Sequence, residues 1–371
     1  MSTATRTDGL PWWATALVLP VFNIALALLI SALVILAIGE DPVGALTSML
    51  AGAFGSGTGL GYTLYYATSL IFTGLSVAVA YHAGLFNIGS EGQAYVGGLG
   101  VGLVCLALGG WPWWLVLPLT ILAGGAFGAA WAAVPGYLQA YRGSHIVITT
   151  IMFNFIAAAL MAYLMVNVLK APGQMSPESR GFDDSVTLPM IHDMLGAIGI
   201  ETANAPLNLS LPLALAACAL VWLFIWHTRW GFALRTVGAN EHAARYAGMN
   251  ARRITVVAMA LSGALAGLMA INELQGVQHR LLLNFPAGLG FTGIAVALMG
   301  RAHPAGIIPA AILFGGLLQG GAELAFDYQS ISPELVVVIQ GVVILFAGAL
   351  EHMFRPALAR LFTRSAKPVG A

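Results

Sequence analysis

IVITTIMFNFIAAALMAYLMVNVL, residues 146–169, contains no charged side chain and is long enough to cross the hydrocarbon core of a membrane, which takes a helix of about 20 residues. Apolar segments of the same kind recur along the chain. We expect the other spans to be Trp12–Ile38, Tyr62–His82, Gly92–Leu108, Trp113–Pro135, Leu209–His227, Ile254–Leu274, Leu289–Gly300, Ala305–Leu324 and Leu335–Met353. The sequence therefore predicts an all-α integral membrane protein with about ten transmembrane helices.

The composition fits a protein whose solvent is lipid. Apolar residues make up 59% and charged residues 8% of the 371-residue chain, whereas soluble domains carry about 25% charged residues. The net charge is zero, so no global field favours nucleic acid as a partner. The apolar run that begins at Trp12 is too long for a signal peptide, and we interpret it as a retained first helix. Cys105 and Cys218 lie inside apolar runs and are interpreted as packing residues.

Two of the predicted spans are weak. The segment 289–300 is short and the segment 92–108 is marginal. Either could be a half-helix that its neighbours bury, because broken backbone at membrane depth needs protein or water around it. Close helix contacts are expected at the small-residue spacings Gly124/Gly128 and Gly263/Gly267.

Lysine and arginine accumulate on the cytoplasmic side of membrane proteins, and their positions orient the chain. With ten spans and a cytoplasmic N-terminus, the basic stretch 229–253 lies in the cytoplasm together with Arg142, Arg301 and the C-terminal tail. The segment 170–208, in which acids outnumber bases, lies outside as the extracytoplasmic loop. Its turn residues indicate an ordered loop with one short helix near Ile191–Ile198. Both termini are expected in the cytoplasm, and residues 1–371 form a single transmembrane domain.

The segment Gly84-Leu-Phe-Asn-Ile-Gly-Ser-Glu-Gly-Gln93 joins two apolar segments and contains the polar residues Asn87, Glu91 and Gln93. Such a break exposes backbone groups and a helix N-terminus, which suits recognition of a polar substrate or a cytoplasmic gate. The alternative is a tight cytoplasmic turn in which Glu91 caps the next helix. The residues alone leave both interpretations open.

Polar residues also occur within the apolar segments. The uncharged ones either hydrogen-bond neighbouring helices or line a path for substrate. The candidate residues of the substrate path are Asn87, Glu91, Gln93, Asn154, Gln319 and Gln340. The acids Glu273 and Glu323 fall near the predicted outer ends of their spans, where they either reach water or act in transport.

The basic stretch 229–253 contains the signals of one short helix. Asn240 suits the N-cap position and Gly248 suits the position just after the C-cap. Between them lies a small apolar face of Ala243, Ala244 and Ala247. A face so small cannot be a core element, so the helix is expected to lie on lipid headgroups or in a groove of a partner protein.

These segments resemble a known family. The stretch 231–250 is similar to the coupling loop of bacterial ABC importer permeases in the superfamily that serves branched-chain amino acids, ribose and nucleosides. Residues 86–93, FNIGSEGQ, resemble the narrower branch that serves nucleosides and related simple sugars. Further similarity lies in Leu261–Gly267, Gly290–Leu298 and Gly315-Gly316. The resemblance covers roughly residues 60–350. Where relatives often carry Asn-Glu, this chain has Ser144-His145, which bears on the choice of substrate.

The resemblance implies the permease subunit of an ATP-binding-cassette importer that moves a nucleoside or a related small polar solute across the bacterial cytoplasmic (inner) membrane. It implies a second permease subunit, a cytoplasmic ABC ATPase that binds ATP, and an extracytoplasmic substrate-binding protein as partners. It also implies that the loop transmits the motion of the ATPase. The residues assigned to this coupling are Arg235, Gly238, Asn240, Glu241, Ala243, Ala244, Ala247 and Gly248.

The chain lacks the residues for chemistry of its own. A Walker A motif needs a Gly-Lys pair, and neither Lys170 nor Lys367 follows a glycine. ATP hydrolysis is therefore expected on a separate subunit. The histidines form no metal-binding pattern, so we expect no metal, no bound cofactor and no catalytic residue.

Other functions remain open at this stage. A simple-sugar or branched-chain amino acid ABC permease would share the same features. An ion-coupled secondary transporter would need buried acids or a cation site, whereas the acids here cluster near the membrane edges. A membrane enzyme would need a catalytic constellation, and the sequence offers none.

Overall fold

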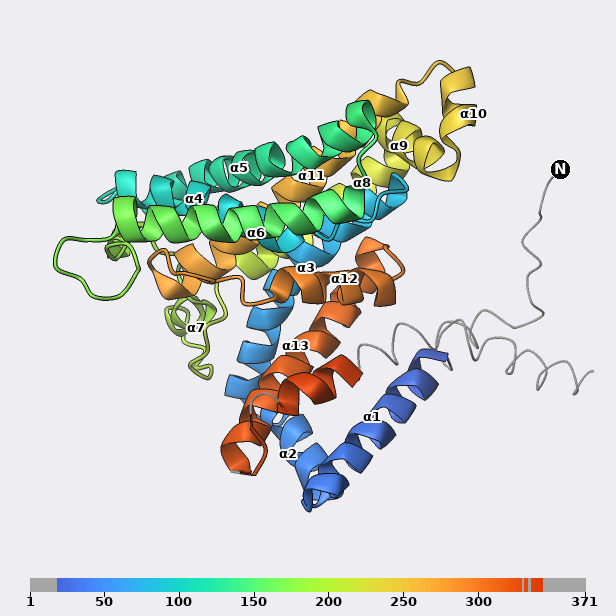
Figure 1. Cartoon of the computed structure of the whole chain (residues 1–371). Helices are drawn as coiled ribbons and strands as arrows, with labels where there is room; N and C mark the ends of the chain where they lie inside the picture. Colours follow the sequence, from blue (N-terminus) through green and yellow to red (C-terminus); the bar gives the residue numbers. More distant parts are fainter. Residues whose placement is uncertain (1–18, 329, 333–334, 343–371) are drawn as a thin grey trace, which may run out of the picture. The chain divides into compact units, whose positions relative to one another are not determined.

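The computed structural model describes residues 19–328, 330–332 and 335–342 (Figure 1). Regular structure in these residues is helical, with two isolated antiparallel bridges, Lys170 to Ser179 and Met190 to Asn208. The chain divides into two compact units. Residues 53–319 form the larger unit, and the residues up to 52 together with those from 320 form the smaller one. The all-α class predicted from the sequence is confirmed.

Helix α3 (Gly57–His82) is the central helix of the larger unit. It is buried without interruption from Ala67 to Ala80, because α8, α11 and α12 pack around it. The other helices that begin in this unit are α4 (Ser90–Ala107), α5 (Trp113–Arg142), α6 (Ile146–Leu164), α7 (Ile191–Gly196), α8 (Ser210–His227), α9 (Arg229–Ala239), α10 (Glu241–Tyr246), α11 (Ala251–Ala270), α12 (Leu289–Met299) and α13 (Pro304–Asp327). Two of them continue as π-helix, α6 through Met165–Leu169 and α11 through Ile271–Gln278.

Helices α5 and α11 run side by side in Figure 1 and make the most extensive helix–helix contact of the unit. Glycines bring their backbones together. A side chain on Gly128 would collide with the carbonyl oxygen of Gly263, and one on Gly267 would collide with that of Gly124. Gly97 of α4 meets Gly267 at the same place. Helices in lipid associate through such close van der Waals packing, so the predicted role of these glycine spacings is confirmed.

Six helices in the described part of the chain are long and apolar enough to cross a membrane. They are Gly57–His82, Trp113–Arg142, Ile146–Leu169, Ser210–His227, Ala251–Gln278 and Pro304–Asp327. A bent pair near the N-terminus brings the number to seven if it forms one span. The predicted count of ten spans is not confirmed, and the cytoplasmic position of both termini stays a prediction.

Two weak spans fall short for physical reasons. Helix α12 has 11 residues, so it is about 16 Å long and covers roughly half of the hydrocarbon thickness. Helix α4 has 18 residues, but glycine, serine and amide side chains dilute its apolarity. Most of α4 is buried among other helices and needs no lipid-compatible surface. Parts of the first and last predicted spans, residues 12–18 and 343–353, and the basic C-terminal tail lie outside the described residues.

The segment 170–208, which we call the outer segment because the sequence predicts it to lie outside, packs onto the π-helical end of α11. The backbone N–H of Phe182 donates to the carbonyl of His279 at 2.7 Å, and that of Leu188 donates to the carbonyl of Gln275 at 3.1 Å. Both side chains are part of a hydrophobic core. The segment also contains α7, at the place where the sequence predicts a short helix.

The smaller unit is built on α1 (Leu19–Ile38) and most of α2 (Pro42–Phe54), which are bent by 119° at their junction. Asp41 stabilises the start of α2, since its carboxylate accepts the backbone N–H groups of Val43 at 3.1 Å and Gly44 at 2.9 Å. The buried core of this unit consists of Ile35, Ala45, Leu324, Ile331, Val336 and Ile339. Helix α2 is not among the predicted segments, because its apolar run is shorter than a membrane span.

Replacing Gly128 with alanine should destabilise the larger unit, because the added methyl group falls on the Gly263 carbonyl oxygen and forces α5 and α11 apart. Overpacking of this kind costs about 1–3 kcal/mol, so the unfolding temperature of the purified protein should fall. Gly125→Ala is the matched control on the same helix, because the nearest neighbour of its methyl group, the side chain of Ala264, is 3.9 Å away. Equal unfolding temperatures for the two variants would contradict this contact.

Candidate functional site

The segment 84–93, which we call the joint, connects α3 to α4. Asn87 and Gln93 are buried and face each other across it. Asn87 Nδ2 donates to Gln93 Oε1 at 2.8 Å, and Gln93 Nε2 donates to Asn87 Oδ1 at 3.1 Å. Asn87 Nδ2 also donates to Ser262 Oγ on α11 at 2.8 Å. The two amide groups are therefore engaged within the chain, as buried polar groups must be.

Glu91 reaches from α4 to the first turn of α12. Its two carboxylate oxygens accept the backbone N–H groups of Gly288 and Gly290, each at 2.8 Å. A helix N-terminus presents unpaired N–H groups and a partial positive charge, so a carboxylate is favourable there. Glu91 is a capping residue, but the helix that it caps is α12 and not the next helix in the chain.

Asn154 of α6 holds the start of α4 from the other side. Its Oδ1 accepts the backbone N–H of Gly92 at 2.9 Å, and its Nδ2 donates to the carbonyl of Ile88 at 2.9 Å. Four of the six predicted path residues therefore meet at the joint. Ser144 and His145, the pair that departs from the family pattern, precede the first residue of the same helix α6.

The other two predicted path residues lie elsewhere. Gly315 of α13 meets the backbone of Thr63 in the first half of α3. Gln319, one turn further along α13, is therefore away from the joint, which follows the last residue of α3. Gln340 belongs to the smaller unit.

The basic stretch 229–253 folds as α9, α10 and the start of α11. Asn240 caps α10, because its side chain accepts the backbone N–H of Ala243 at 3.0 Å. Gly248 follows the end of α10 with a φ of 78°, and its N–H donates back to the carbonyl of Arg245 at 3.0 Å. The N-cap and the terminating glycine predicted from the sequence are confirmed.

The prediction that Ala243, Ala244 and Ala247 form one apolar face free of their own protein is wrong. Ala244 has 0% of its surface exposed, whereas Ala243 and Ala247 are exposed. Helix α10 packs against α9 and α11, and its buried residue is Ala244. The exposed side carries the ion pair of Glu241 with Arg245 and the side chain of Tyr246, which is 94% exposed. Helical spacing groups the alanines, but it does not tell which side of the helix faces its own protein.

Gly238 near the end of α9 touches the joint. A side chain on Gly238 would collide with the carbonyl oxygen of His82 and with the backbone of Ala83 and Gly84. Gly84 has a φ of 72°, which glycine adopts without the strain that a side chain brings. The stretch 229–253 and the joint therefore meet backbone to backbone. Arg235, one turn earlier, has a buried Nε without a hydrogen-bond partner in the described part of the chain.

A buried acid lies at the far end of α11. Glu273 is only 4% exposed, and its carboxylate accepts the hydroxyl groups of Tyr65 and of Ser69, the latter at 2.6 Å. The Ser69 hydroxyl itself accepts Asn272 Nδ2 at 2.7 Å, so its proton is directed to the carboxylate. Among the described residues, no ion pair includes Glu273. These four residues form the Glu273 cluster.

The expectation that Glu273 reaches water at an outer end is not met. The outer segment folds over this end of α11, and Asn208 donates from its Nδ2 to Asn272 Oδ1 at 3.0 Å. The sequence does mark Glu273 as unusual, because it is an acid within an apolar span. It does not predict the long-range contacts that bury this acid.

These contacts order the larger unit along α3 and α11. At one end of α3 the backbone of His82 meets Gly238, and at the other end Tyr65 meets Glu273. In the middle, the hydroxyl oxygens of Ser76 and Ser262 are 3.1 Å apart. The two helices are therefore antiparallel. The joint and the stretch 229–253 lie at one end, and the Glu273 cluster and the outer segment lie at the opposite end.

Comparison with known proteins matches residues 59–348 to the family described as the branched-chain amino acid transport system permease component. The chain is 34% identical to the guanosine ABC transporter permease protein NupP of Bacillus subtilis, over 94% of this chain and 98% of that protein. It is 34% identical to a glucose ABC transporter permease of Haloferax volcanii, over 93% and 90% of the two chains. It is 33% identical to the nucleoside ABC transporter permease protein NupB of Lactococcus lactis, over 95% and 96%. The matched region agrees with the range of the resemblance seen in the sequence.

Glu91→Gln should destabilise the protein, because a carboxamide has one acceptor oxygen where the carboxylate uses two. One N–H at the start of α12 then loses its partner, which costs about 1–3 kcal/mol, and the unfolding temperature should fall. Glu241→Gln, at an exposed ion pair, is the control and should change stability by less than about 0.5 kcal/mol. An unchanged unfolding temperature in Glu91→Gln together with lost transport would instead assign Glu91 to the substrate path.

Proposed function

Because this chain belongs to the family of branched-chain amino acid transport system permease components, we propose that it carries a nucleoside or a closely related small polar solute. The chain is a multi-pass membrane permease of a bacterial ABC importer, a transport subunit rather than an enzyme. The FNIGSEGQ motif at the joint and the guanosine and nucleoside permeases among its relatives support a nucleoside. A simple sugar is the second candidate, because a glucose permease is equally similar.

The observation that carries the coupling mechanism is the backbone contact of Gly238 with the joint. We propose that a cytoplasmic ABC ATPase, which binds the ATP, docks on the exposed side of α10 and displaces α9. Gly238 touches the backbone of the joint and has no flexible side chain that could absorb the displacement. A movement of α9 would therefore move Gly84 and, through the joint, the start of α4. There the joint holds α4, α6, α11 and α12 together through Glu91, Asn154 and the amide pair.

The remaining partners follow from the two ends of the larger unit. We propose that an extracytoplasmic substrate-binding protein docks on the outer segment, at the opposite end from α10. A second permease subunit, related to this chain or identical with it, would complete the membrane part of the importer. The order of events is alternating access, in which docking outside and ATP binding inside act on opposite ends of α3 and α11.

Uptake measurements decide the substrate class. The complete transporter, with its own ATPase and binding protein, should accumulate labelled guanosine in cells that lack other nucleoside uptake. Unlabelled nucleosides should compete, and glucose should not. A variant of the ATPase that binds but does not hydrolyse ATP is the control and should abolish accumulation. Accumulation of glucose without accumulation of nucleosides would overturn the substrate proposal and leave the permease assignment intact.

Ala247→Arg should uncouple the permease from its ATPase without unfolding it, because Ala247, the residue directly after α10, is exposed. An arginine buried without a partner in the docked interface costs about 3–5 kcal/mol, so co-purification of the ATPase and ATP-dependent uptake should be lost. Ala197→Arg on the outer segment is the matched control, since Ala197 is equally exposed on the other side. Ala244→Arg is not a suitable test, because Ala244 is buried within the permease itself. A retained ATPase and wild-type uptake in Ala247→Arg would refute docking on this side of α10.

A further inference from the structure

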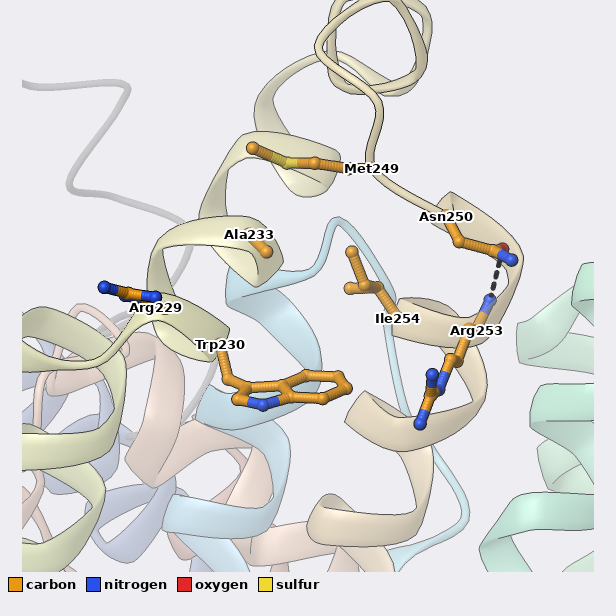
Figure 2. Close-up of a pocket in the computed structure, with 7 residues that line it drawn as sticks. All are labelled: Arg229, Trp230, Ala233, Met249, Asn250, Arg253 and Ile254. Atoms are coloured by element: carbon orange, nitrogen blue, oxygen red, sulfur yellow. Dashed lines mark hydrogen bonds between the residues drawn. The ribbon is translucent and has the colours of Figure 1, made fainter.

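A pocket of about 260 Å³ opens between the start of α9 and the start of α11 (Figure 2). It is lined by Arg229, Trp230, Ala233, Met249, Asn250, Arg253 and Ile254. Four of these side chains are apolar or aromatic, and two are guanidinium groups. In the view of Figure 2, Arg229 and Arg253 lie on either side of the Trp230 ring. The pocket therefore combines an apolar wall with two positive charges.

Within the described residues, neither Arg229 nor Arg253 forms an ion pair with an acid. The guanidinium of Arg253 lies over the Trp230 ring, 5.5 Å from its centroid, and stacking of this kind leaves the N–H donors in its plane available. The backbone N–H of Arg253 donates to Asn250 Oδ1 at 3.1 Å (Figure 2), which fixes the first turn of α11.

The pocket lies at a membrane boundary. The membrane-spanning helix α8 ends at His227, and the next span begins at Ala251, so both walls of the pocket lie at ends of spans. Trp230 is 46% exposed, and tryptophan concentrates at the level of the lipid headgroups. Leu220 and Leu223 lie one turn apart on α8 and form an exposed apolar strip on the span that ends next to the pocket. The arginine-rich side of the chain faces the cytoplasmic leaflet, which carries the anionic lipids.

We propose that the pocket of Arg229, Trp230 and Arg253 binds the headgroup of an anionic phospholipid. The lipid phosphate accepts hydrogen bonds from the guanidinium of Arg253, which suits phosphate geometry, and Arg229 on the other side of the Trp230 ring adds a second positive charge. The glycerol and the first methylene groups lie against Trp230 and Ile254, and the acyl chains follow the strip on α8. An acidic peptide of a protein partner would meet the same charges, but it would leave this apolar strip without a role. The bound lipid ties the start of α9 to the start of α11.

Binding of phosphatidylglycerol to the full-length protein tests the proposal. The protein is reconstituted in phosphatidylcholine with or without phosphatidylglycerol, and retained lipid is counted by native mass spectrometry. The double variant Arg229→Gln/Arg253→Gln should bind phosphatidylglycerol about tenfold or more weakly, since it loses the charge-assisted hydrogen bonds of Arg253 and the positive charge of Arg229. The control Arg142→Gln/Arg252→Gln removes the same charge from the same side, with Arg252 lying over Tyr141 outside the pocket, and it should bind like the wild type.

Every other outcome overturns the proposal. Equal binding of phosphatidylglycerol by the wild type and the pocket variant would show that the pocket is not the lipid site. Equal loss of binding in both double variants would show that the lipid responds only to the general positive charge of this surface. Inorganic phosphate that competes as well as the lipid would identify a free phosphate site. Loss of the ATPase from the pocket variant, with lipid binding unchanged, would identify a protein interface. Trp230→Ala keeps both charges and should also weaken binding, which keeps the test valid if the double variant fails to fold.

Discussion

The close approach of α5 and α11 at Gly128 and Gly263 is the contact on which the rest of the larger unit depends. Helices gain little from burying apolar surface against each other when lipid is equally apolar. They associate through dispersion, which falls off steeply with separation. Helices whose backbones touch directly, with no side chain between them, therefore attract each other most strongly. Gly97 brings α4 to the same place. A weakly apolar α4 is tolerated because most of its residues are buried against other helices and few of them face lipid.

The position of α11 along α5 determines where two separate regions of the larger unit lie, one at each end of α11. Helix α11 carries the basic pocket and the stretch 229–253 at its start, and the Glu273 cluster at its π-helical end. Helix α3 runs antiparallel to it and is bound at two levels, through Glu273 and through Ser262, which contacts both Ser76 of α3 and Asn87 of the neighbouring joint. In the proposed mechanism, a displacement at α9 would therefore act on a pair of helices that are fixed to each other.

The sequence predicts those features that depend on near neighbours in the chain. The long apolar runs, the cap of Asn240, the terminating Gly248 and the glycine spacings of α5 and α11 are all local patterns, and the structure contains them. Contacts between segments that are far apart in the sequence cannot be predicted from such local patterns. The cap that Glu91 provides to α12 joins residues nearly two hundred positions apart, and the buried Glu273 is held by Tyr65 and Ser69 of α3, which are about as distant in the sequence. Orientation of Ala244 towards its own protein is likewise set by packing against α9 and α11.

The hydrogen bonds of the joint limit what the joint can do in transport. Asn87 and Gln93 use their amide groups on each other, and Asn154 uses its amide on the backbone at the start of α4. Exchanging such a bond for one to water or to a hydroxylated solute costs little, because the net contribution of a hydrogen bond is about 1 kcal/mol. Leaving a buried partner unsatisfied costs about 1–3 kcal/mol for each group. A role in the substrate path is therefore compatible only with a state in which solute or water enters as the amide pair separates. The displacement that we propose at Gly238 would act on the backbone of Gly84, three residues before Asn87 of that pair.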